Sequence, residues 1–210
     1  MKLYYFPVAP NPTRVLLYLA EKQAAGSEIP LELVQVDVRK GEQHGREHLA
    51  RNPFGRLPVL ELDDGSCLTE SLAIIHYLEE LHPEPGLIGG TPLERARVRE
   101  LERVAELGVL YSIARIVHAT DSPFGFPTSR EIADFYRPRL EKALDFLEGR
   151  LADSRPFIAG EGVTLADCTL QAGLQFGRFG GQPLDPSYVR LDRWDRAFRE
   201  RPGVREILRH

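Results

Sequence analysis

Strand-like patterns in this 210-residue chain are confined to its first 82 residues, and this asymmetry is the strongest constraint on its fold. Residues 2–6 and 31–38 alternate in polarity, while 57–62 and 66–69 flank a "DDG" turn as a hairpin. Helical patterns separate these strands, so the expected order is βαβ followed by ββα. That order predicts a small α/β domain in which helices pack on a sheet.

Two helices are expected in this first part. Residues 13–25, "TRVLLYLAEKQAA", carry a helical pattern, and Asn11 followed by Pro12 is typical of a helix N-cap with proline at the first helical position. Residues 70–83, "ESLAIIHYLEELHP", predict an amphipathic helix that ends at Pro83. The polar run "GEQHGREHLARN" predicts a loop with a short helix.

A stretch rich in proline and glycine, "PEPGLIGGTP", separates the strand-containing part from a helical remainder. We therefore expect an α/β domain at 1–82, a linker at 83–92 and an all-helical domain at 93–210. The helical stretches are expected at 93–119, 130–153, 163–180 and from 191 onward. Thr164 to Asp167 has the spacing of a capping box at the start of the third stretch.

The composition excludes several classes of protein. The net charge is -4 with both signs interspersed, which gives no reason to expect nucleic acid or a membrane surface as a partner. Cys67 and Cys168 lie far apart, so we expect two thiols in a reducing compartment. No signal-peptide pattern or membrane-spanning run is seen, and we expect a cytoplasmic protein. The histidines and cysteines show no metal-ligand spacing, so no metal is expected.

Four motifs occur in one order along the chain: "APNPTRVLLYLAEK", "NPFGRLPVL", "LTESLAIIHYLEE" and "FIAGEGVTLADCTL". With these motifs the whole chain resembles the glutathione transferases, most closely cytosolic bacterial members with Asn in place of the usual Ser, Cys or Tyr. The resemblance implies a thioredoxin-like domain followed by a helical bundle, usually as a homodimer. It also implies glutathione as co-substrate and a role in detoxification.

The motifs "RLPVL" and "TESLAI" are the expected glutathione-binding segments. The resemblance implies a cis Leu57–Pro58 bond, which turns the Leu57 backbone outward to pair with an extended peptide. Glu70 and Ser71 stand at a helix start, where free N–H groups and a hydroxyl suit an anion and the Glu70 carboxylate suits an ammonium. A γ-glutamyl group carries both charges. By themselves, these residues also fit an ordinary strand start and an ordinary helix cap.

The loop before Pro58 is the expected site for the glycyl end of glutathione. Gln43 lies 15 positions before Pro58, as in the bacterial relatives that carry a Gln there. Arg56, Lys40 and His44 can add positive charge for the glycyl carboxylate. The alternative is a solvated loop.

Two residues are candidates for activating the thiol, Asn11 as the leading one and Tyr5 as its rival. Ala9 occupies the usual Ser or Cys position, so Ser-type activation is doubtful. Asn11 can cap the helix through Oδ1 while its NH2 group donates to a thiolate, aided by the helix dipole. Tyr5 resembles the strand-end tyrosine of the Tyr-using classes. Either residue can instead be structural.

The second substrate is expected in the helical domain. Tyr111, Arg115, Phe124 and Phe126 lie near the end of the first long helix and its broken loop, where they can line a pocket. Aromatic residues at such positions more often belong to the core. The identity of the electrophile is not readable from the sequence.

The resulting hypothesis is a transferase of alkyl or aryl groups that presents a glutathione thiolate to an electrophile. One alternative is a glutathione-dependent disulfide reductase or peroxidase, which would use glutathione for both thiols because the turn has no cysteine. A second is a non-catalytic binding or scaffold protein, which Ala9 favours and the Glu70–Ser71 pair opposes. A third is a glutathione-dependent isomerase or dehalogenase.

Overall fold

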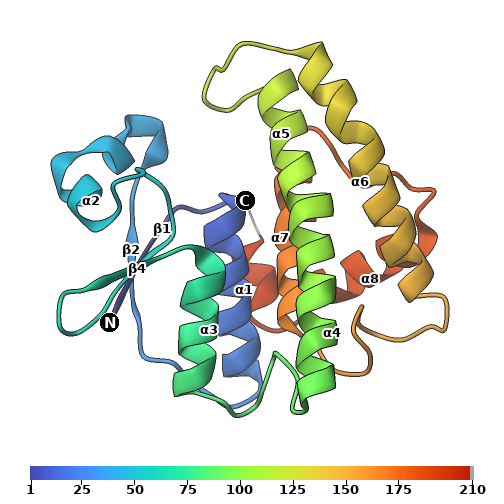
Figure 1. The fold of residues 1–210 in the computed structure, drawn as a ribbon, viewed down its shortest axis with the longest axis horizontal. Helices are drawn as coiled ribbons and strands as arrows, with labels where there is room; N and C mark the ends of the chain where they lie inside the picture. Colours follow the sequence, from blue (N-terminus) through green and yellow to red (C-terminus); the bar gives the residue numbers. More distant parts are fainter. Residues whose placement is uncertain (209–210) are drawn as a thin grey trace.

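The computed structural model describes residues 1–208 and contains a four-stranded mixed sheet followed by a helical part (Figure 1). The strand order is β2-β1-β3-β4, with β1 parallel to β2 and antiparallel to β3, and with β3 antiparallel to β4. The strands are β1 (Lys2–Tyr5), β2 (Glu32–Gln35), β3 (Val59–Glu61) and β4 (Cys67–Thr69). They lie where the sequence predicts strands, and the βαβ then ββα order is confirmed.

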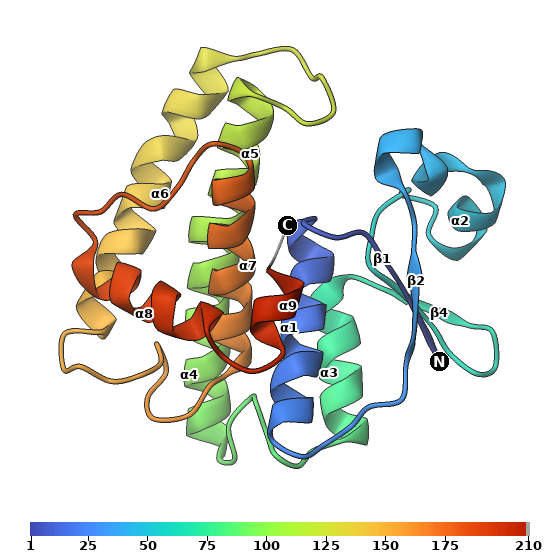
Figure 2. The same ribbon diagram turned by 180° about the vertical axis from the view of Figure 1, so that it is seen from behind.

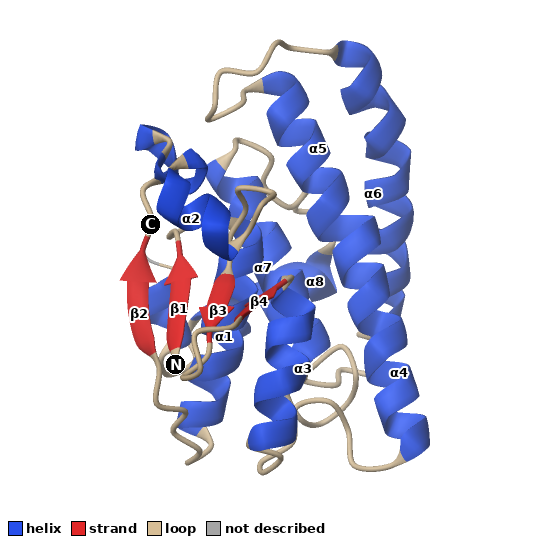
Figure 3. Ribbon diagram, turned by 60° about the vertical axis from the view of Figure 1, so that its left-hand side comes forward, coloured by secondary structure: helices blue, strands red, loops and turns tan. Residues whose placement is uncertain are grey.

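Helices make up most of the remaining structure (Figure 3). In the first part they are α1 (Pro10–Ala24), the short η1 (Val38–Lys40) and η2 (Glu42–His44), α2 (Arg46–Arg51) and α3 (Ser71–Leu81). In the second part they are α4 (Pro92–Arg103), the π-helical η3 (Val104–Leu110), α5 (Tyr111–Thr120), α6 (Arg130–Arg150), α7 (Leu165–Phe179), α8 (Val189–Arg199) and α9 (Val204–Ile207). No helix within residues 1–208 is long and apolar enough to cross a membrane.

The helices α1 and α3 lie side by side between the sheet and the helical part (Figures 1 and 2). Leu3 of β1 and Leu60 of β3 are opposite each other in the sheet, and both are fully buried. Val15 of α1 and Ile74 of α3 are fully buried in the same cluster. Removing these apolar side chains from water stabilises the packing of the two helices on the sheet.

The helix α7 is the centre of the helical part, and every residue from 165 to 177 is buried. The capping box predicted at its start is confirmed: the Thr164 N–H and hydroxyl donate to Asp167 Oδ2 at 2.9 and 2.8 Å. The other oxygen, Asp167 Oδ1, accepts from the Ile158 N–H at 3.0 Å and from the Trp194 indole N–H at 3.2 Å. Asp167 thereby joins α7 to the preceding loop and to α8.

The predicted start of α1 is wrong by two residues. The helix begins at Pro10, and the Ala9 carbonyl accepts from the Thr13 N–H at 3.0 Å, so Ala9 and not Asn11 is the N-cap. Pro10 and Pro12 both fit this first turn, because its N–H groups have no partner within the helix. Asn11 therefore lies inside the first turn, and its side chain is free for another interaction.

Candidate active site

One shallow groove brings together most of the residues predicted to bind glutathione. It lies where α1 begins, where the chain enters β3 and where β4 turns into α3. Its lining residues are Asn11, Asn52, Arg56, Leu57, Pro58, Glu70 and Ser71. The volume of the groove is only about 40 Å³, room for a few water molecules at most, so a peptide ligand would lie across the groove rather than inside it.

The entry into β3 supplies backbone groups to the groove. The Leu57–Pro58 peptide bond is cis, as the sequence predicts. Within residues 1–208 neither the Leu57 N–H nor its carbonyl takes part in a hydrogen bond. Backbone groups need partners, so both are available to an extended peptide that pairs like an added strand.

The loop before Leu57 is held by two side chains that meet one carbonyl group. Asn52 Nδ2 donates to the Arg56 carbonyl at 2.9 Å, and His48 Nε2 lies 3.0 Å from the same oxygen. Asn52 Oδ1 accepts from the Phe54 N–H at 3.1 Å, which closes the turn. Sequence reasoning did not single out Asn52, although an Asn followed by Pro is a known signal for such a turn.

Buried Arg14 of α1 fixes the two polar side chains that come from the helix starts. Arg14 is 2% exposed, and its Nε donates to Ser71 Oγ at 2.7 Å while Nη2 donates to Asn11 Oδ1 at 2.9 Å. In each contact the oxygen of Ser71 or Asn11 is the acceptor. The Asn11 NH2 group and the Ser71 hydroxyl hydrogen therefore remain as donors on the groove.

Two glutamates of the helical part balance the charge of Arg14. Glu106 accepts from Arg14 Nη2 at 2.7 Å, and Glu102 lies 3.3 Å from Nη1. Burial and the neighbouring Glu106 charge raise the pKa of Glu102 to about 7, against the lowering effects of Arg14 and Arg103 and of the Thr169 hydroxyl. Glu106 belongs to η3, so the π-helical segment is part of the support of the groove.

Two turns at the groove have backbone conformations that the sequence does not reveal. Glu70, the N-cap of α3, has φ of 67°, and Val8, just before α1, has φ of 69°. Left-handed conformations are uncommon outside glycine, and residues held in them gather at functional sites. No side chain caps the N–H groups of the first turn of α3, and this turn carries no acidic side chain, so these groups are available to an anion.

Several predicted site residues are not among those that line the groove. Tyr5 ends β1 opposite Gln35 of β2. Gln43 lies in η2, where its Oε1 is buried and has no hydrogen-bond partner among the described residues. Lys40 is exposed and lies 3.7 Å from Asp37.

The predicted second-substrate residues lie along α5 and the loop after it. Tyr111 and Arg115 are exposed, and both contact the Tyr136 ring of α6. The centroids of the Tyr111 and Tyr136 rings are 5.8 Å apart, and the guanidinium carbon of Arg115 lies 5.8 Å from the Tyr136 centroid. Phe124 and Phe126 are exposed and gather around the His118 ring, each at 5.5 Å. The aromatic residues are thus not plain core.

Comparison with known proteins identifies the family. Residues 3–86 match the family model "Glutathione S-transferase, N-terminal domain", and residues 100–208 match "Glutathione S-transferase, C-terminal domain". The chain is 32% identical over 212 residues to "Glutathione S-transferase 2" of Saccharomyces cerevisiae, with 99% of this chain and 89% of the yeast protein covered. It is 42% identical over 100 residues to a maleylacetoacetate isomerase of Pseudomonas aeruginosa, covering 47% of this chain and 45% of that protein.

Solved structures agree with this match over nearly the whole chain. The crystal structure of Gtt2 from Saccharomyces cerevisiae superimposes with a TM-score of 0.87 at 31% identity, covering 99% of this chain and 100% of that one. A glutathione S-transferase domain-containing protein of Marinobacter aquaeolei gives a TM-score of 0.88 at 32% identity, covering 97% and 100%. This chain therefore belongs to the glutathione S-transferase family.

Proposed function

We propose that this protein is a glutathione transferase that holds glutathione across the groove, lowers the pKa of its thiol and presents the thiolate to an electrophilic carbon. The observation that carries this proposal is the double contact of Arg14. One buried guanidinium holds Asn11 and Ser71 by their oxygen atoms, which leaves a donor of each for the ligand.

The groove suits the parts of glutathione in order. The Ser71 hydroxyl and the N–H groups at the start of α3 would bind the γ-glutamyl carboxylate, and the Glu70 carboxylate would bind its ammonium. The Leu57 backbone would pair with the cysteinyl unit. Gln43 and Arg56 would bind the glycyl end.

We assign the stabilisation of the thiolate to the Asn11 NH2 group. Asn11 lines the groove and lies in the first turn of α1, where the helix dipole also favours negative charge. Ala9 offers no polar side chain at the neighbouring position. Tyr5 is the rival, and it does not line the groove.

The test is a spectroscopic pH titration of the thiolate of bound glutathione in the wild type and in Asn11→Ala and Tyr5→Phe. A hydrogen bond to a charged group contributes about 1.5–3 kcal/mol, so we expect Asn11→Ala to raise the pKa of the bound thiol by about one to two pH units. Tyr5→Phe should leave this pKa unchanged. Asn11→Ser, which keeps a donor at the same position, is the matched control and should recover part of the effect.

Other outcomes would redirect the assignment. A raised thiol pKa in Tyr5→Phe alone would move the role to Tyr5. Glutathione that binds to the wild type with an unshifted thiol pKa would refute catalysis by thiol activation and favour a binding or scaffold protein.

A second candidate is a glutathione-dependent isomerase. The observation in its favour is the 42% identity with the Pseudomonas aeruginosa maleylacetoacetate isomerase over 47% of this chain. Parallel assays of maleylacetoacetate isomerisation and of glutathione conjugation to an aryl halide separate the two. Turnover of a glutathione mixed disulfide in the same series would indicate the reductase instead.

We also propose a cytoplasmic homodimer, as the family resemblance implies. Apolar side chains exposed along the continuous α4–η3–α5 helix are consistent with a partner on that side: Leu93 is 62%, Leu107 54% and Tyr111 46% exposed. Size-exclusion chromatography with light scattering gives the mass directly. A monomeric mass would refute the homodimer and leave the thiol chemistry untouched.

A further inference from the structure

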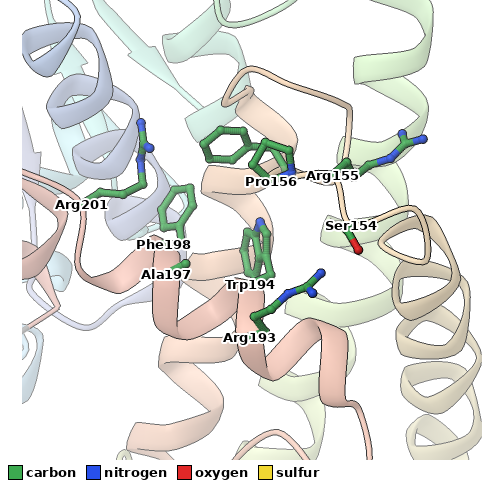
Figure 4. A pocket seen from close by; sticks show the side chains of 9 residues that line it. Ser154, Arg155, Pro156, Arg193, Trp194, Ala197, Phe198 and Arg201 are labelled. Carbon is green, nitrogen blue, oxygen red and sulfur yellow. The ribbon is translucent and has the colours of Figure 1, made fainter.

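A cavity of about 280 Å³ lies in the helical part, between residues 154–157 and α8 (Figure 4). Its aromatic rings are covered by the protein itself. Trp194 is 3% and Phe198 1% exposed, and the guanidinium carbon of Arg201 lies 4.9 Å from the centre of the Phe157 ring. These rings therefore give a ligand no free apolar wall. The groove at the starts of α1 and α3 differs, because free backbone groups line it, and their position depends on α2.

The helix α2 lies on the face of the sheet opposite to α1 and α3 (Figures 1 and 2). Side chains alternate along a strand, so Tyr4 of β1 points to this face, while its neighbour Leu3 is buried in the core with α1 and α3. Tyr4, Val36 and Val59 form a small buried cluster there, and the partly buried Leu57 side chain packs against it. The residue whose backbone groups are free on the groove is thus anchored by its side chain to this face.

Arg51, the last residue of α2, joins this helix to the sheet. Its guanidinium carbon lies 4.3 Å from the centre of the Tyr4 ring, and its Nε donates to Glu61 Oε2 at 3.2 Å. The Tyr4 hydroxyl donates to the same oxygen at 2.9 Å. The hydrogen bond from Tyr4, and then that from Arg51, hold the pKa of Glu61 below its ordinary value against the opposing effect of burial. A guanidinium that stacks on a ring and pairs with a carboxylate is fixed in two directions.

The same end of α2 holds the residue before Leu57. His48 Nε2 lies 3.0 Å and Asn52 Nδ2 lies 2.9 Å from the Arg56 carbonyl oxygen. Both side chains are buried, and Asn52 directly follows Arg51 in the chain. The Arg56 carbonyl and the Leu57 N–H belong to one planar trans peptide unit, in which they point in opposite directions. Fixing the Arg56 oxygen on α2 therefore also fixes the direction of the Leu57 N–H.

We propose that Arg51 is a positioning residue for glutathione: it fixes α2 on the sheet and thereby fixes the Leu57 N–H that pairs with the cysteinyl unit. Arg51 itself does not line the groove. The inference rests on the proposed function, since it concerns the same groove. Without the stack and the ion pair, α2 is free to shift, and part of the binding free energy is then used to order the Leu57 backbone. Affinity for glutathione falls, while the Asn11 donor on the opposite side of the groove is unchanged.

The test combines equilibrium titration with glutathione and steady-state conjugation to an aryl halide in the wild type, Arg51→Met and Arg51→Lys. We expect Arg51→Met to raise the Kd and the KM for glutathione about tenfold, with kcat at saturating glutathione within about twofold of the wild type. A variant that merely folds less well shows the opposite pattern, since fewer active molecules lower kcat and leave KM unchanged. Arg51→Lys keeps the charge but loses the planar guanidinium, so its Kd should lie between the other two.

Controls separate positioning from the loss of a positive charge. Arg46→Met removes a charge at the exposed first position of α2 and should leave the Kd unchanged. Glu61→Gln breaks the same ion pair from the sheet and should raise the Kd in the same direction, even if Arg51→Met does not fold. The double variant of Arg51→Met and Glu61→Gln should bind little worse than either single variant, because both remove one contact. Combination of Arg51→Met with Ser71→Ala should instead multiply the two losses, since Ser71 serves the γ-glutamyl end.

The inference is overturned if Arg51→Met and Glu61→Gln bind glutathione as the wild type does, or if Arg46→Met weakens binding as much as Arg51→Met. It is also overturned if kcat falls while KM stays constant, because the role of Arg51 would then be structural alone. Wild-type protein that does not bind glutathione would refute the proposed function and this inference with it. Wild-type protein that binds glutathione with an unshifted thiol pKa refutes thiol activation but not this inference, whose readout is the Kd.

Discussion

The buried carboxyl of Glu102 should make the stability of the fold depend on pH near neutrality. Burial and the charge of Glu106 raise its pKa from the ordinary 4.5 to about 7. Between these values the folded protein binds a proton that the unfolded chain has released. Because the folded state then holds more protons, the free energy of unfolding falls as the pH rises. The difference between the two pKa values corresponds to about 3 kcal/mol in the free energy of unfolding. This stabilisation is fully present below pH 4.5 and is lost above pH 7.

The assay is urea denaturation at closely spaced pH values from about 4.5 to 8 for the wild type and Glu102→Gln. The glutamine keeps an oxygen for Arg14 and for the Thr169 hydroxyl, but it does not titrate. Subtracting the two profiles removes every other titration, including that of Asp167, whose pKa burial raises to about 6. The wild type should lose about 3 kcal/mol relative to Glu102→Gln across this range.

A control variant tests whether the pH dependence of stability requires a buried carboxyl or follows from the removal of any carboxyl. Glu100→Gln changes an exposed carboxyl on the same helix, and its profile should run parallel to that of the wild type. The reasoning is refuted if the difference between the wild type and Glu102→Gln stays constant with pH. It is equally refuted if the wild type gains stability relative to Glu102→Gln as the pH rises, which would mean that Arg14 lowers the pKa of Glu102 more than burial raises it.

Two further predictions concern ligand binding and packing. Ser71→Ala removes a groove donor and leaves the buried Arg14 Nε without its acceptor, so the Kd for glutathione in equilibrium titration should rise about tenfold or more, while a donor-preserving Ser71→Thr should lose less. In η3, an added Cβ at Gly108 would clash with Ala143 of α6, so Gly108→Ala should destabilise the fold by about 1–3 kcal/mol in urea denaturation. The control Gly149→Ala, with nothing near the added atom, should be neutral or stabilising, and equal effects of the two glycine variants would refute the packing argument.

The sequence predicts the elements of the fold because those signals are local, and the resemblance of its motifs adds six of the seven residues that line the groove, all but Asn52. Alternation, turn residues and capping patterns mark the strands and helices, and Leu57, Pro58, Glu70 and Ser71 each stand beside such a mark. The start of α1 was missed because proline is tolerated at both candidate positions, and only the hydrogen bond from Thr13 to Ala9 decides between them.

Nonlocal contacts explain what the sequence does not predict. Arg14 reads as one polar residue in an amphipathic helix, yet its partners Glu102 and Glu106 lie 88 and 92 positions further along the chain. The cavity beside α8 likewise forms only when the segment after α6 folds back onto that helix. No periodicity or spacing in the sequence relates residues so far apart. Their contacts are therefore visible only in the three-dimensional structure.

The contacts of Arg14 affect how the groove responds to pH. Arg14 contacts the Asn11 amide and the Ser71 hydroxyl, two neutral groups whose charge does not change with pH. Only the charge behind it changes: Glu106 also pairs with the half-exposed Arg103, and ionisation of Glu102 adds one negative charge to this group. We therefore expect the donors on the groove to keep their orientation across the pH range in which Glu102 titrates. A pH profile of thiol reactivity near neutrality should then follow the glutathione thiol itself, and the stability profile should follow Glu102.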